Sequence, residues 1–154
     1  METALKIYTD GGCSGNPGPG GWAYVMVIKT FSGDKIIAQN KGAQKDTTNN
    51  RMELSAVICA LRALKTMNDV PRQATIITDS QYVQKGITEW IRKWKSNSWR
   101  TADKTPVKNK DLWLELDALA LEFPLQWEWV KGHAGNEYNE MCDAMTQEAI
   151  AEIK

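Results

Sequence analysis

The chain has 154 residues, 42% of them hydrophobic and 25% charged, and its 19 basic residues balance 19 acidic ones. This composition excludes intrinsic disorder and indicates one domain, residues 1–154, with a buried core. Because the longest apolar run, near Ala56–Leu64, is too short to span a bilayer and no signal peptide or cysteine framework stands out, we expect a cytoplasmic, monomeric protein without membrane attachment.

The first third of the chain reads as β structure. β-branched and aromatic residues between turn signals predict three strands, at Leu5–Thr9, Gly21–Lys29 and Lys35–Gly42. A helix is predicted next, beginning after the capping residues 48–50 and ending near Met67.

The second half alternates strands and helices. Strands are predicted at Ala74–Thr78 and Leu125–Val130, and helices at Ser80–Trp94, Lys110–Leu121 and Asn139–Ile153. The resulting order, βββαβααβα, predicts an α/β fold in which helices cover a mixed sheet.

Positive charge and tryptophan are concentrated in one segment. Lys85–Lys110 contains eight basic and two acidic residues, a net charge of +6, together with Trp90, Trp94 and Trp99. Basic charge interleaved with aromatic rings is typical of nucleic-acid binding. The alternative is a solvated helix with core tryptophans, since Trp90 and Trp94 also follow helical spacing.

Two predicted strands end in an aspartate, Asp10 after Ile7–Thr9 and Asp79 after Ile76–Thr78. If these strands are parallel neighbours, the two carboxylates lie about 4.8 Å apart, at the edge where α/β sheets place their sites. Such close anions require a proton or a cation between them. Taken alone, either aspartate could instead cap a helix or a turn.

Two further carboxylates border the apolar stripes of predicted helices. Glu53 precedes Val57 by one turn, and Asp143 precedes Ile150 by two turns. A carboxylate near the core must be paired, hydrogen-bonded or metal-bound. Four such carboxylates, with a single histidine in the chain, favour an oxygen-preferring ion such as Mg²⁺, or Mn²⁺ in its place.

Two glycine-rich loops complete the candidate site. Cys13–Gly21 follows Asp10 and combines glycines, which allow close backbone approach to a ligand, with stiffening prolines. His133 is flanked by Gly132 and Gly135, a position suited to proton transfer. The alternatives are a simple hairpin connection and a surface histidine.

Five segments carry long motifs that match one family in order and spacing. They are TDGGCSGNPGPGGWA (Thr9–Ala23), TTNNRMEL (Thr47–Leu54), TDSQYV (Thr78–Val83), WIRKWKSNSWRTADKTPVKNKDLW (Trp90–Trp113) and WVKGHAGNEYNEMCD (Trp129–Asp143). On these segments nearly the whole chain resembles the bacterial ribonuclease HI family. The resemblance implies the ribonuclease H-like fold, a five-stranded mixed sheet flanked by helices.

The resemblance also implies roles for individual residues. The metal-binding carboxylates would be Asp10, Glu53, Asp79 and Asp143, and His133 would assist proton transfer and product departure. Contacts to an RNA strand would come from the loop containing Cys13 and Asn16, from Asn49 and from Gln81. A DNA phosphate would lie against Thr48 and Asn109. The DNA strand would meet Trp90 on a basic protrusion at about residues 90–108, with Lys93, Lys95 and Arg100 gripping the hybrid.

The implied activity is endonucleolytic hydrolysis of the RNA strand of RNA–DNA hybrids by a two-metal-ion mechanism, giving 5′-phosphate and 3′-hydroxyl products. Two alternatives remain. Another nuclease on the same fold predicts a DxE pair on the first strand, whereas Gly11 and Gly12 follow Asp10. A non-catalytic hybrid-binding module predicts the loss of at least one carboxylate, and all four are present.

Overall fold

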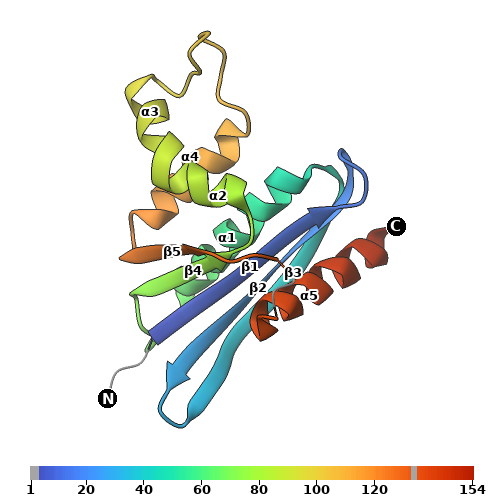
Figure 1. Cartoon of the computed structure of the whole chain (residues 1–154), viewed down its shortest axis with the longest axis vertical. Helices are drawn as coiled ribbons and strands as arrows, with labels where there is room; N and C mark the ends of the chain where they lie inside the picture. The colour runs from blue at the N-terminus through green and yellow to red at the C-terminus, as the bar shows by residue number, and fades with distance from the viewer. Residues whose placement is uncertain (1–3, 133–134) are drawn as a thin grey trace.

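The computed structural model describes residues 4–132 and 135–154. A five-stranded sheet forms its centre, with the order β3-β2-β1-β4-β5 (Figure 1). Strand β2 pairs antiparallel with β1 and β3, whereas β1, β4 and β5 run parallel. This arrangement confirms the predicted mixed sheet. The strands are β1 (Ala4–Cys13), β2 (Gly18–Thr30), β3 (Gly33–Thr47), β4 (Ala74–Thr78) and β5 (Leu125–Trp129).

Helices cover both faces of the sheet, and each face has its own core (Figure 1). Successive strand residues alternate between the faces, as a pleated strand requires. In β1, for example, Ile7 packs in the cluster under α1 (Asn49–Thr66), and Tyr8 packs in the cluster under α5 (Glu137–Ile153). This two-residue period is visible in the sequence, and it explains why the strands are predictable.

The predicted helix at Ser80–Trp94 is divided into three parts. The chain forms α2 (Gln81–Lys85), a π-helical turn η1 (Gly86–Trp90) and α3 (Ile91–Ser96). Gly86 is buried against the ring of Trp113 in α4 (Lys110–Ala120), and a Cβ at Gly86 would overlap that ring. The π turn lies where the segment packs this closely, a contact that helical periodicity does not reveal.

The first three strands are longer than predicted, because antiparallel backbone pairing continues beyond their apolar residues. Cys13 pairs with Gly20 and Gly12 with Gly21, so most of the predicted Cys13–Gly21 loop is strand. Only residues 14–17 form the hairpin connection. Within the described residues, no helix has the length and apolarity needed to cross a membrane.

Candidate active site

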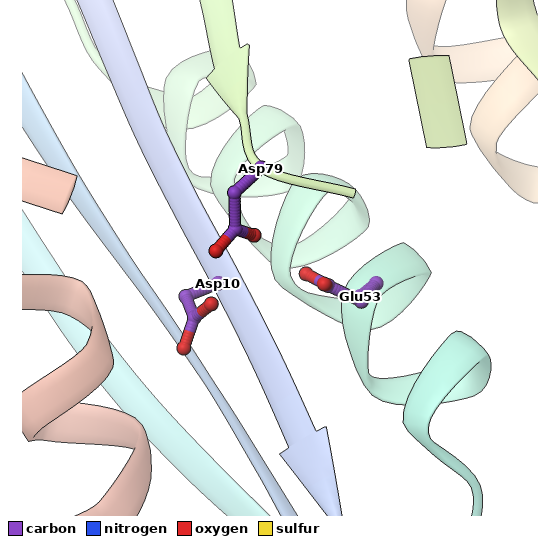
Figure 2. Close-up of side chains that lie close together, drawn as sticks. All are labelled: Asp10, Glu53 and Asp79. Carbon is purple, nitrogen blue, oxygen red and sulfur yellow. The ribbon is translucent and has the colours of Figure 1, made fainter. Parts of the chain in front are cut away.

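Three carboxylates converge where β1 and β4 lie side by side. The parallel register pairs Thr9 with Thr78, which places the next residues, Asp10 and Asp79, on adjacent strands. Glu53 points toward them from the second turn of α1 (Figure 2). One carboxylate oxygen from each of the three residues lies within 4.8 Å of the others.

Gly11 lets α1 approach the sheet closely enough to form this triad. A Cβ at Gly11 would overlap the backbone between Met52 and Glu53. The Gly11 backbone also hydrogen-bonds the carboxylates of Asp10 and Glu53, which partly opposes the rise in pKa that burial causes in each. Gly11 therefore lets the helix pack closely on the sheet and also supplies a backbone hydrogen-bond donor to the carboxylates.

Burial and mutual repulsion dominate the electrostatics of the triad. Asp10 and Glu53 are 5% and 6% exposed. Burial, followed by repulsion from Asp79, raises the pKa of Asp10 to about 8, although the Thr146 hydroxyl opposes this rise. Burial and the charges of Asp10 and Asp79 raise the pKa of Glu53 well above its ordinary value.

These features fit a bound cation. The Oε1 atom of Glu53 is buried and has no hydrogen-bond partner within the described parts of the chain. A buried carboxylate oxygen in that state is costly unless a ligand satisfies it. Because every donor in the triad is a carboxylate oxygen, the site suits a hard divalent ion.

Asp143 lies outside this triad. It is half-buried on α5, and its charge contributes to the raised pKa of Asp10. The structure therefore brings three of the four candidate carboxylates within ligand spacing and places the fourth at electrostatic range of Asp10.

The chain after β5 passes against Asp79. The indole N–H of Trp129 donates a hydrogen bond to the Asp79 carbonyl oxygen at 3.0 Å. A Cβ at Gly132 would lie 2.9 Å from the Asp79 Oδ2 atom, so a side chain at this position would displace the Asp79 carboxylate. His133, the candidate proton-transfer residue, lies outside the described residues.

The hairpin between β1 and β2 contacts the start of α1. The Asn16 side-chain oxygen accepts a hydrogen bond from the Asn49 backbone N–H at 3.0 Å. The Cys13 thiol faces the carbonyl oxygens of Gly18 and Thr47, at 3.3 and 3.4 Å. Cys13 is thus engaged inside the hairpin, whereas Asn16 and Asn49 are exposed at its surface.

A separate pocket of about 460 Å³ lies beside this hairpin. It brings together Thr48 and Asn109, the two residues assigned to a DNA phosphate, and adds the cation of Lys108. Thr48 also caps α1, because its hydroxyl accepts the Arg51 backbone N–H at 3.3 Å. The complete lining is Asn16, Pro17, Thr48, Asn49, Asn50, Lys108 and Asn109.

The α3 helix and the segment after it extend away from the sheet (Figure 1). At their base, Trp90 is half-buried, with its ring centre 5.8 Å from that of Tyr82 and 5.9 Å from that of Trp94. Trp90 therefore packs against neighbouring rings, as a core tryptophan would, and also keeps part of its surface accessible to a ligand.

The exposed polar residues of this region differ in their pairing. Gln81, at the start of α2, is exposed, as are Lys93 and Arg100. Lys95 instead forms an ion pair with Asp117 of α4, 2.8 Å between Nζ and Oδ1. Lys95 stays a predicted contact to the hybrid, and the ion pair partly neutralises its charge within the fold.

Sequence reasoning missed Arg51 and Tyr82. The Arg51 guanidinium reaches Asn109 and Asp111, and the Tyr82 hydroxyl accepts hydrogen bonds from Asn109 and Trp113. Both residues stand inside motifs noted in the sequence, but their partners are remote in the chain and follow no spacing rule.

Comparison with known families and proteins agrees with this geometry. A family model described as RNase H matches residues 2–151. A ribonuclease H of Treponema denticola is 54% identical over 159 aligned positions, which cover 97% of this chain and 98% of that protein. A ribonuclease H of Anaplasma marginale is also 54% identical, with 95% and 90% covered.

Solved structures show the same likeness. The crystal structure of LC9-RNase H1, a type 1 RNase H with the type 2 active-site motif, matches with a TM-score of 0.86 and 28% identity, covering 100% of this chain and 75% of that one. RNase H1 from the halophilic archaeon Halobacterium salinarum NRC-1 matches with a TM-score of 0.70 and 26% identity, covering 97% and 98%.

Proposed function

The chain belongs to the RNase H family, and on this premise we propose that it hydrolyses the RNA strand of RNA–DNA hybrids endonucleolytically, leaving a 5′-phosphate and a 3′-hydroxyl. The observation that carries the proposal is the convergence of Asp10, Glu53 and Asp79 at the carboxyl ends of two parallel strands. A buried, all-carboxylate site is suited to divalent-metal phosphodiester chemistry.

We propose Mg²⁺ as the cofactor, with Mn²⁺ as a substitute, held by Asp10, Glu53, Asp79 and Asp143. When bound, two such ions would activate the attacking water and stabilise the departing 3′-oxygen. The Gly11 backbone hydrogen-bonds two of these carboxylates, and the Trp129 indole holds the backbone of the third, Asp79. His133 would transfer a proton and assist product departure.

The surfaces beside the triad would hold the two strands. Asn16, Asn49 and Gln81 offer exposed amide groups suited to RNA 2′-hydroxyls, which distinguish RNA from DNA. Because the Cys13 side chain is engaged in its hairpin, its contact would come from the backbone. The pocket containing Thr48 and Asn109 would receive a DNA phosphate.

The protrusion at about residues 90–108 would complete the grip on the DNA strand. Trp90 would contact that strand, while Lys93 and Arg100 supply the exposed charge. We further propose that residues 1–154 act as one domain, since both cores share the same sheet.

A cleavage assay tests the function. An end-labelled RNA–DNA hybrid, duplex RNA and duplex DNA are each incubated with the protein in Mg²⁺ or in a chelator. We expect internal cuts in the RNA strand of the hybrid only, and only with the metal. Asp79→Asn should abolish cleavage while the variant remains folded.

The alternatives give different results in the same assay. A non-catalytic module would bind the hybrid without cutting it, even in Mg²⁺. Another nuclease of the same fold would cut a control duplex or release nucleotides from strand ends. Either result would overturn the proposal.

A further inference from the structure

We propose that Arg51 is a positioning residue that orients the Asn109 side chain in the pocket assigned above to a DNA phosphate. The inference rests on the proposed function, because it explains how that pocket is assembled. Arg51 lies in the first turn of α1, between the pocket residue Thr48 and the triad residue Glu53.

The Arg51 guanidinium grips the start of α4 with both of its terminal nitrogens. Nη2 donates to Asp111 Oδ2 at 2.7 Å, and Nη1 donates to Asp111 Oδ1 at 3.0 Å. Nη1 also donates to Asn109 Oδ1 at 3.3 Å. A planar guanidinium in this forked arrangement fixes direction as well as distance.

Asn109 is held by side-chain hydrogen bonds at both ends of its amide. Its φ of 61° and ψ of 28° lie in the left-handed region, which asparagine adopts more readily than most residues other than glycine. Arg51 holds its side-chain oxygen, and its amide nitrogen donates to the Tyr82 hydroxyl at 3.1 Å. With the amide fixed at both ends, its second N–H is available to a ligand in the pocket.

Trp113 extends this network into the core. Its indole N–H donates to the same Tyr82 hydroxyl at 2.9 Å, and Trp113 is fully buried. The orientation of Asn109 is therefore tied to rigid parts of the fold on one side and to Arg51 on the other.

Arg51 acts through Asn109 rather than on a phosphate directly. It is not among the residues that line the pocket, whereas Asn109 is. Its charge is also paired with Asp111, whose pKa the guanidinium lowers by hydrogen bonding, so this carboxylate stays ionised.

A second ion pair between the same helices provides a matched control. Arg62 of α1 pairs with Glu115 of α4, farther from the pocket. No described contact links this pair to a pocket residue. Variants of Arg62 and Glu115 therefore disturb only the packing of α4 on α1. Variants of Arg51 and Asp111 disturb this packing and also the position of Asn109 in the pocket.

The test measures the affinity of a fluorescein-labelled RNA–DNA hybrid in chelator at several salt concentrations, together with kcat and KM in Mg²⁺. The variants are Arg51→Lys, Asp111→Asn, Asn109→Ala and the double variant of Arg51 and Asn109, with Arg62→Lys and Glu115→Gln as controls. Circular dichroism and thermal melts check that each is folded.

We expect Arg51→Lys and Asp111→Asn each to raise Kd and KM about three- to tenfold, the value of one misplaced hydrogen bond. The kcat should stay within about twofold, and the slope of log Kd against log salt should be unchanged, because every cation that meets a phosphate remains in place. The double variant should be less than additive. The two control variants should bind the hybrid like the wild type.

Any one of the following results would overturn the proposal. Tighter binding by Asp111→Asn would make Arg51 itself the phosphate ligand, because the substitution frees the guanidinium charge from its carboxylate partner. Equal losses of affinity in the control variants would assign the effect to helix docking. Fully additive losses of binding free energy in the double variant would mean that Arg51 and Asn109 act independently. If the wild type neither binds nor cleaves the hybrid, the proposed function fails first; if it does both and the variants match it, only the positioning role fails.

Discussion

Asp10 ionises at a cost in the metal-free protein, since the fold buries it beside two other carboxylates. Its pKa rises from an ordinary 3.8 to about 8, so the folded state binds the proton more tightly than the unfolded chain does. The resulting stabilisation is complete below about pH 4 and is lost as the pH rises through 8. The free energy of unfolding of the metal-free protein should therefore fall over this range.

Asp10→Asn should remove this dependence together with the activity. We expect cleavage to fall to background while the metal-free midpoint at pH 8 rises, by about 2–4 °C for a gain on the order of 1 kcal/mol. At pH 5 the gain should be smaller, because the wild-type carboxyl is then largely protonated. Thermal melts in chelator at both pH values measure the difference. A destabilised variant that still cleaves would remove Asp10 from the site.

Two neighbouring glycines should respond differently to a methyl group. Gly11→Ala would force α1 away from β1, at a cost of about 1–3 kcal/mol, and would lower activity by displacing Glu53. In Gly12→Ala the nearest atom to the new Cβ is Thr146 Cγ2 at 3.6 Å, an ordinary contact. Urea unfolding and hybrid cleavage of both variants check the contrast. Equal behaviour would mean that close packing at Gly11 does not form the triad.

At the scale of the elements, the protrusion formed by α3 and the following segment carries exposed cations, Lys93 and Arg100, and a cation paired within the fold, Lys95. Replacing the exposed Lys93 and Arg100 by alanine should reduce the slope of log binding constant against log salt by about 0.9 for each phosphate that is no longer neutralised, if the hybrid behaves like B-DNA. Lys95→Ala should reduce it less, because Lys95 is paired with Asp117. Anisotropy titrations across a salt series give the slopes. A Lys95 effect as large as either of the others would contradict this division.

At the scale of the whole molecule, the triad joins three elements, because its carboxylates come from β1, α1 and the end of β4. A cation bound there stabilises only the folded state, in which the three elements meet. Mg²⁺ should therefore raise the thermal midpoint of the wild type in a concentration-dependent manner, and chelation should reverse the rise. The midpoint of Asp10→Asn should rise less. Melts across a Mg²⁺ series measure this, and an equal rise in both proteins would place the ion elsewhere.

Much of this architecture could be predicted from local patterns. Alternating strand residues such as Ile7 and Tyr8 face different cores, and Thr48 caps a helix, so both follow from rules that span only a few positions. The strand-end aspartates Asp10 and Asp79 are expected to be neighbours provided that their strands are parallel. The observed register of β1 and β4 confirms that condition.

What local patterns could not predict depends on contacts between distant parts of the chain. Arg51 and Asn109 are 58 positions apart, and Lys95 meets Asp117 on another helix. The π turn at Gly86 likewise accompanies close packing against Trp113. Spacing rules describe one helix or one strand, whereas these pairings depend on how α1, α3 and α4 pack against one another. The sequence by itself therefore predicted the carboxylates of the candidate site. The orientation of Asn109 and the pairing of Lys95 were decided only by the packing of the helices.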